Sequence, residues 1–164
     1  MRICFLMCML AFLLNACSYS FRSASVDAGV NTYYVAQFTN NALDAEPTLP
    51  VTLTENLKEK IRTESRLVYN DTEPDVEFKG VVVRYAVTSE APQPGEVTAI
   101  NRLTITTAVE YINNVNEDKS WKKNFSFFFD FSSSQELASV QDQAIDEISQ
   151  QMMEDIFNAA FNTW

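Results

Sequence analysis

Residues 121–161 read WKKNFSFFFDFSSSQELASVQDQAIDEISQQMMEDIFNAAF, and this stretch contains both periodicities that decide the fold. In its first part aromatic side chains recur with a period of two and alternate with Lys122, Asn124, Ser126 and Asp130, which predicts a β-strand with one aromatic face. In its second part, apolar residues recur at intervals of three and four, which predicts a helix with one apolar stripe. Ser133 and Glu136 have capping-box spacing and are expected to open this helix, which continues to about Asn162. The aromatic face is made of Trp121, Phe125, Phe127, Phe129 and Phe131, and the helical stripe of Leu137, Val140, Ala144, Ile148, Met152, Ile156 and Ala160.

Upstream of this stretch, two further runs are rich in β-forming residues. The run over 99–112 alternates apolar and polar side chains, and a second run covers 76–87. Its apolar phase changes around Gly80, and a glycine inside a strand with such a change indicates a β-bulge there. Loops at 91–95 and 113–120 separate the three runs, so we expect them to pair as antiparallel hairpins.

The start of the domain adds a strand and a second helix. Residues 32–38 are rich in β-formers, and residues 50–66 carry Leu53, Leu57 and Ile61 at four-residue intervals, with Thr52 and Glu55 as a second capping box. Residues 67–69 begin the strand region that leads to the long run at 76. The predicted fold is therefore α+β, in the order β-α-β-β-β-α, with two helices packed on one face of a four-stranded mixed sheet. Residues 30–164 form a single domain in this interpretation.

The N-terminus has the pattern of an export signal. Arg2 is followed by an apolar run over 3–14, which is too short for a transmembrane helix, since such a helix needs about 20 residues. The run ends in Leu14-Asn15-Ala16-Cys17, which resembles a bacterial lipobox. The resemblance implies that residues 1–16 are a lipoprotein signal peptide and that Cys17 carries a diacylglycerol and an N-acyl chain. Residues 17–29 are then a lipidated tether. An ordinary secretory signal with an accidental Cys is the alternative.

The composition excludes several classes of chemistry. The chain has 164 residues, no His, three Cys, three Gly and a formal charge of −10. Without His, neither Ser-His-Asp nor Cys-His catalysis is possible, and His-based zinc sites are excluded as well. The Gly-rich phosphate loops are absent from the sequence, and the excess of acidic residues argues against nucleic acid as a partner. We therefore expect no catalytic residues, no metal site and no cofactor apart from the lipid on Cys17.

The charge is unevenly distributed. Residues 124–164 contain seven acidic side chains and no basic one, so this region would repel an anionic lipid. The basic side chains of the preceding strands are the candidates for contact with such a lipid, namely Arg84, Arg102, Lys122 and Lys123. Solvation and protection of a strand edge by lysine is the alternative explanation for these residues.

The order of these features resembles a known family. The lipobox, the β-α-β-β-β-α order, Ala91-Pro92-Gln93, Asn101-Arg102-Leu103-Thr104-Ile105, Asp155-Ile156-Phe157-Asn158 and the terminal Trp164 are similar to LptE lipopolysaccharide-assembly lipoproteins of the Bacteroidota type. The resemblance implies a non-enzymatic, lipid-anchored protein on the periplasmic side of the outer membrane. It would occupy the lumen of an LptD-type β-barrel as a plug and help to insert lipopolysaccharide into the outer leaflet.

Two other functions remain open from the residues. The first is a free, periplasm-facing lipoprotein that binds an apolar or anionic ligand of the cell envelope, for which the aromatic strand could supply a lipid-binding surface instead of core. The second is a lipid-anchored hydrolase, which is the weakest because the sequence has neither His nor a G-x-S-x-G motif.

Overall fold

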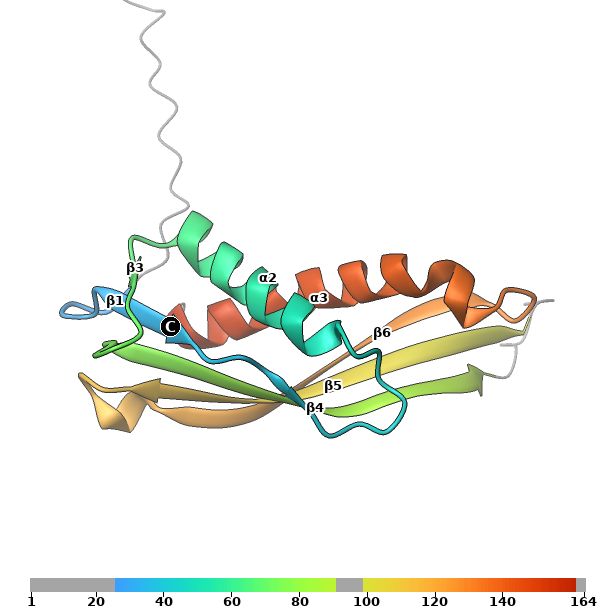
Figure 1. Ribbon diagram of the computed structural model, residues 1–164, viewed down its shortest axis with the longest axis horizontal. Coiled ribbons are helices and arrows are strands. Elements are labelled where there is room, and N and C mark those ends of the chain that lie inside the picture. The colour runs from blue at the N-terminus through green and yellow to red at the C-terminus, as the bar shows by residue number, and fades with distance from the viewer. Residues whose placement is uncertain (1–25, 91–98, 162–164) are drawn as a thin grey trace, which may run out of the picture.

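The computed structural model describes residues 26–90 and 99–161, in which two helices cover one face of a long twisted sheet (Figure 1). The α+β class and the single helix-covered face are confirmed. The elements are β1 (Thr32–Val35), β2 (Thr39–Asn40), α2 (Leu49–Glu64), β3 (Val68–Tyr69), β4 (Val76–Glu90), β5 (Ile100–Asn113), the 3-10 turn η1 (Glu117–Lys119), β6 (Trp121–Ser132) and α3 (Leu137–Phe161).

Within the described residues the sheet has six strands, where four were predicted. Its order is β3-β1-β4-β5-β6, and β2 pairs with β4 beyond the end of β1. Of the first predicted strand, residues 32–38, only Thr32–Val35 form β1; β2 begins just after it at Thr39, and residues 68–69 form the separate strand β3 at the edge. The pairing directions are as expected, because β1 runs parallel to β4 while β4, β5 and β6 are antiparallel neighbours.

The break between β1 and β2 is caused by Phe38. Its ring, 2 % exposed, lies over the backbone of Gly80, where an added Cβ would be only 2.5 Å from Cδ2 and 2.6 Å from Cγ. The Phe38 N–H donates to Thr54 Oγ1 of α2 at 2.9 Å, so the amide that leaves the sheet ladder is still satisfied. Gly80 thus provides room for an aromatic ring.

The predicted bulge at Gly80 is wrong in position. Gly80 pairs in register with Val109, and the register between β4 and β5 shifts between Val82 and Arg84. Val83 is the extra residue and is 43 % exposed, while Tyr85 returns to the core. The bulge therefore lies three residues later than the glycine, where it changes which face of the sheet Arg84 occupies.

Neither predicted capping box opens its helix. α2 begins at Leu49 after Thr48, so Thr52 lies inside the first turn, where its hydroxyl donates to the Thr48 carbonyl at 3.3 Å. α3 begins at Leu137, four residues after Ser133. The chain from Ser132 first turns back from β6, with the Gln135 N–H bonded to the Ser132 carbonyl.

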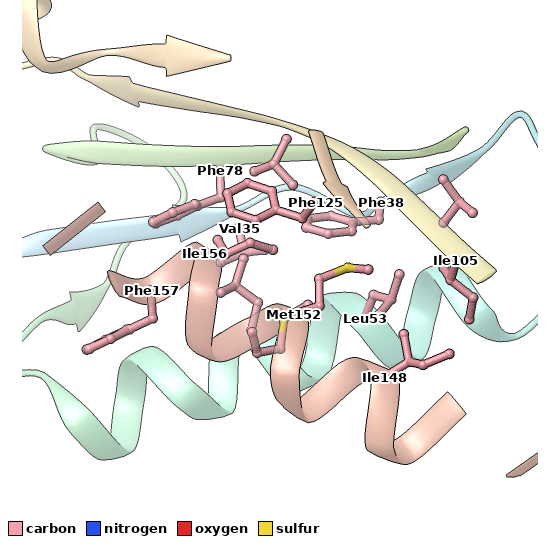
Figure 2. Packing of buried hydrophobic residues seen from close by; sticks show 14 of the residues in the cluster. Val35, Phe38, Leu53, Phe78, Ile105, Phe125, Ile148, Met152, Ile156 and Phe157 are labelled. Atoms are coloured by element: carbon pink, nitrogen blue, oxygen red, sulfur yellow. The ribbon is translucent and has the colours of Figure 1, made fainter. Parts of the chain in front are cut away.

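The core lies between the helices and the sheet (Figure 2). Leu53, Leu57 and Ile61 of α2 are fully buried, as are the α3 residues Ile148, Met152 and Ile156. The aromatic strand belongs to this core, since Phe125 and Phe131 are 9 % and 5 % exposed and Phe127 and Phe129 pack against it. The core interpretation of that face is confirmed.

Candidate functional site

One face of the sheet is covered by neither described helix, and we call it the open face. Side chains alternate between the two faces of a strand, and paired residues of neighbouring strands share a face. Since Val109 and Phe125 point to the core, the alternate positions of β5 and β6 point to the open face. Three rows across the strands contain the basic residues of β4, β5 and β6 on this face: Thr88, Arg102 and Asp130; Arg84, Thr106 and Ser126; Lys79, Glu110 and Lys122.

The first row holds a paired arginine. Arg102 Nε and Nη2 donate to the two Asp130 carboxylate oxygens at 2.7 and 2.8 Å, and the guanidinium lies 3.9 Å from the centre of the Phe128 ring. These hydrogen bonds hold the pKa of the Asp130 carboxyl below its usual range and raise the pKa of Arg102. Phe128 is 52 % exposed. An anionic ligand would have to compete with Asp130 for this cation.

The third row is also internally paired. Lys122 Nζ lies 3.0 Å from Glu110 Oε1, and Lys79 Nζ lies 3.1 Å from Glu77 Oε2. Exposed ion pairs of this kind contribute little to stability, so both lysines can exchange partners at low cost. A shallow depression of about 350 Å³ lies here, lined by Lys79, Val81, Ala108, Val109, Glu110, Lys122, Lys123 and Asn124.

The middle row contains the cation that is least compensated. Arg84 is exposed and forms no ion pair with any residue in the described ranges 26–90 and 99–161. Beside it, the Thr106 and Ser126 hydroxyls are hydrogen-bonded to each other at 2.9 Å. Neighbouring rows are four residues apart, or about 14 Å at the rise of a β-strand. The cations thus form a line along the open face and do not converge on one point.

Lys123 is separated from the other three predicted residues. It pairs with the core residue Val109 and so belongs to the helix-covered face, where its Nζ lies 5.1 Å from the centre of the Trp121 ring. The structure therefore brings Arg84, Arg102 and Lys122 onto one surface, whereas Lys123 belongs to the opposite face by strand alternation, although it also borders the depression beside Lys122. Lys79 and Phe128 share that surface but were not predicted, although their register with Glu110 and Thr104 follows from the same strand alternation.

Several sequence predictions lie outside the described residues. These are the signal peptide 1–16, Cys17, the tether up to residue 25, the loop residues Ala91-Pro92-Gln93 and Trp164. Over the described ranges, no group of three or more potential metal-ligating side chains occurs. No described helix is long and apolar enough to cross a membrane.

A family model described as LptE, lipopolysaccharide-assembly, matches residues 30–160. The chain belongs to the LptE family. The match runs from residue 30, two residues before β1, to the last turn of α3, so the resemblance inferred from the sequence is confirmed. Membership of this family supports the interpretation of the chain as a lipoprotein of the cell envelope. No curated protein is significantly similar to the chain in sequence.

Some solved structures are similar to the chain at low sequence identity. A protein from Xanthomonas campestris is 12 % identical, with a TM-score of 0.50 over 84 % of this chain and 93 % of its own. A protein from Chlamydia trachomatis is 7 % identical, with a TM-score of 0.48 over 82 % and 99 %. A minor lipoprotein from Acinetobacter baumannii is 12 % identical, with a TM-score of 0.44 over 76 % and 94 %. At 12 % identity, the similarity to the Xanthomonas campestris protein concerns the fold only.

Proposed function

We propose that this LptE-family chain is the outer-membrane lipoprotein that plugs and supports an LptD-type β-barrel and assists insertion of lipopolysaccharide into the outer leaflet. The observation that carries the proposal is the family match across the entire α+β domain. No bond is made or broken in this function, so the protein acts by binding and by filling space. Cys17, acylated after signal cleavage, would hold it at the periplasmic side of the membrane, with the domain in the barrel lumen.

The open face is the surface proposed to meet the phosphates of lipopolysaccharide. The rows that carry its cations are about 14 Å apart along the strands, a spacing that suits an extended ligand with several anionic groups. Arg84 offers a charge that no described carboxylate neutralises, and Arg102 and Lys122 can add to it by releasing Asp130 and Glu110. On the helix-covered side of the sheet, α3 carries five exposed acidic residues, which disfavours an anion there: Asp142, Asp146, Glu147, Glu154 and Asp155.

Isolation of the full chain from native membranes tests whether the chain occupies the lumen of a barrel partner. We expect gentle detergent extraction followed by affinity capture to yield a large outer-membrane barrel together with the chain, because a plug is enclosed by its partner. An unrelated outer-membrane lipoprotein with the same tag is the control. Capture of the chain without any barrel would overturn the plug and favour the free, ligand-binding lipoprotein.

Charge reversal tests the open face. Arg84→Glu is expected to weaken binding of purified lipopolysaccharide about tenfold or more, since it replaces an uncompensated cation by an anion at the ligand surface. Arg62→Glu is the matched control, because it makes the same change of charge at an exposed position of α2, on the helix-covered side of the sheet. Binding is measured by fluorescence titration of the full chain, and circular dichroism checks the fold. Equal weakening by the two variants would show that only net charge matters and would remove Arg84 from the site.

A further inference from the structure

The two edges of the sheet are built differently. At one edge the strands β3 and β2 are two residues each, and Phe38 interrupts the ladder between β1 and β2. At the other edge, β6 is 12 residues long and pairs with β5 in one register from Trp121 to Ser132 without a bulge. No described strand pairs with the outer side of β6. A long, regular edge therefore presents a row of unpaired backbone groups.

The β6 edge also lacks most of the usual protection against pairing. Proteins protect exposed edges with lysine, proline, bulges or very short strands. β6 has no proline or glycine, and its two lysines, Lys122 and Lys123, both lie at the start of the strand. Between Asn124 and Phe129 it carries no charge, and every second residue from Phe125 to Phe131 is aromatic. This composition favours pairing with another strand.

The charges of β6 are complementary to those of a second β6 in one register. If two copies pair antiparallel about a two-fold axis at Ser126, Lys122 of each copy lies opposite Asp130 of the other. Since Lys122 is already paired with Glu110 and Asp130 with Arg102, the four side chains form a row of alternating sign across the joined sheets. The same register puts Phe125 opposite Phe127 on the core side, and such aromatic cross-strand pairs are favourable.

Other registers lack this complementarity. An axis at Phe127 places Lys122 opposite Ser132 and Asp130 opposite Asn124, so neither charge meets an opposite one. An axis between two residues would place the aromatic face of one copy beside the polar face of the other, which strand alternation strongly disfavours. The axis at Ser126 is therefore the register that satisfies both the charges and the faces.

We propose that the isolated chain forms a weak homodimer through antiparallel pairing of β6 about Ser126, independently of the proposed barrel partner. A single strand pair belongs to the smallest class of protein interfaces, so the association should be reversible and concentration-dependent. The net charge of −10 opposes it, and salt should therefore tighten it by screening the repulsion between the two copies.

Disulfide trapping of the purified full chain in detergent tests the register. Ser126→Cys puts two thiols directly opposite each other, and Cα atoms paired in a sheet are about 4.5–5.5 Å apart, within the range that a disulfide spans. We expect mild oxidation to give a covalent dimer. Thr106→Cys is the matched control, since Thr106 hydrogen-bonds Ser126 on the same face but lies on the inner strand β5. The unsubstituted chain controls for its own cysteines.

A mixture of Asn124→Cys and Phe128→Cys chains completes the test. These positions are opposite each other only in the proposed register, so the mixture should form a heterodimer and neither chain should cross-link alone. Light scattering of the unsubstituted chain should show dimer at high concentration. Ser126→Lys should raise the protein concentration at which half of the chains are dimeric about tenfold or more, because it places like charges opposite each other at the axis. A Ser126→Cys chain that stays monomeric, or that cross-links only to another protein in membranes, overturns the homodimer.

Discussion

Replacing Gly80 by valine is expected to destabilise the domain by about 3 kcal/mol or more, at the upper end of what overpacked cores show. The added Cβ would lie 2.5 Å from Cδ2 of the Phe38 ring, so one of the two must move. The ring cannot move freely, because the Phe38 N–H is bonded to Thr54 of the packed helix α2. Urea unfolding followed by circular dichroism measures the loss as a lower midpoint.

Substituting Phe38 as well shows whether the clash with its ring causes the loss of stability. Phe38→Ala alone leaves a cavity and is itself costly, but it removes the clash, so the double variant should lose clearly less stability than the two single losses combined. Ala108→Val is the control for a β-branched residue on the neighbouring strand, since Ala108 points to the open face, and its effect should be small. Additive losses at Gly80 and Phe38 would contradict the contact.

The elements that were predicted from the sequence are those whose periodicity is long. The aromatic alternation of β6 and the apolar stripes of α2 and α3 each repeat several times, so the two helices and the three long strands could be located. The breaks could not, because they depend on tertiary contacts. Phe38 leaves the strand to fill the space above Gly80, and nothing local to residues 32–38 indicates that contact.

The candidate site was predicted in part for the same reason. Arg102 and Lys122 are on the open face by simple alternation from Phe125. Without the bulge at Val83, Arg84 would share the phase of the core residue Val82. The extra residue turns the guanidinium to the open face and returns Tyr85 to the core. Lys123 was grouped with Lys122 as a sequence neighbour, although neighbours on a strand point to opposite faces.

Replacing Cys17 by serine is expected to abolish acylation and remove the chain's own attachment to the membrane. The expectation rests on the lipobox, since a serine hydroxyl cannot form the thioether to diacylglycerol. Each buried methylene of an acyl chain contributes about 0.8 kcal/mol, and stable anchoring needs more than one chain, so losing the site should shift nearly all of the barrel-free protein to the soluble fraction.

The readout must distinguish the lipid from the barrel, because a plug without acyl chains could still be held by its partner. Intact mass of the purified chain reports acylation directly, and fractionation after overexpression beyond the available barrel reports the anchor. Cys8→Ser is the matched control, since it alters a thiol within the signal peptide and should leave mass and location unchanged. A Cys17→Ser chain that keeps an acyl mass would show that the lipobox interpretation is wrong. If the mass is lost while the barrel is still captured, the fold alone makes the partner interface and the lipid serves only to concentrate the chain at the membrane.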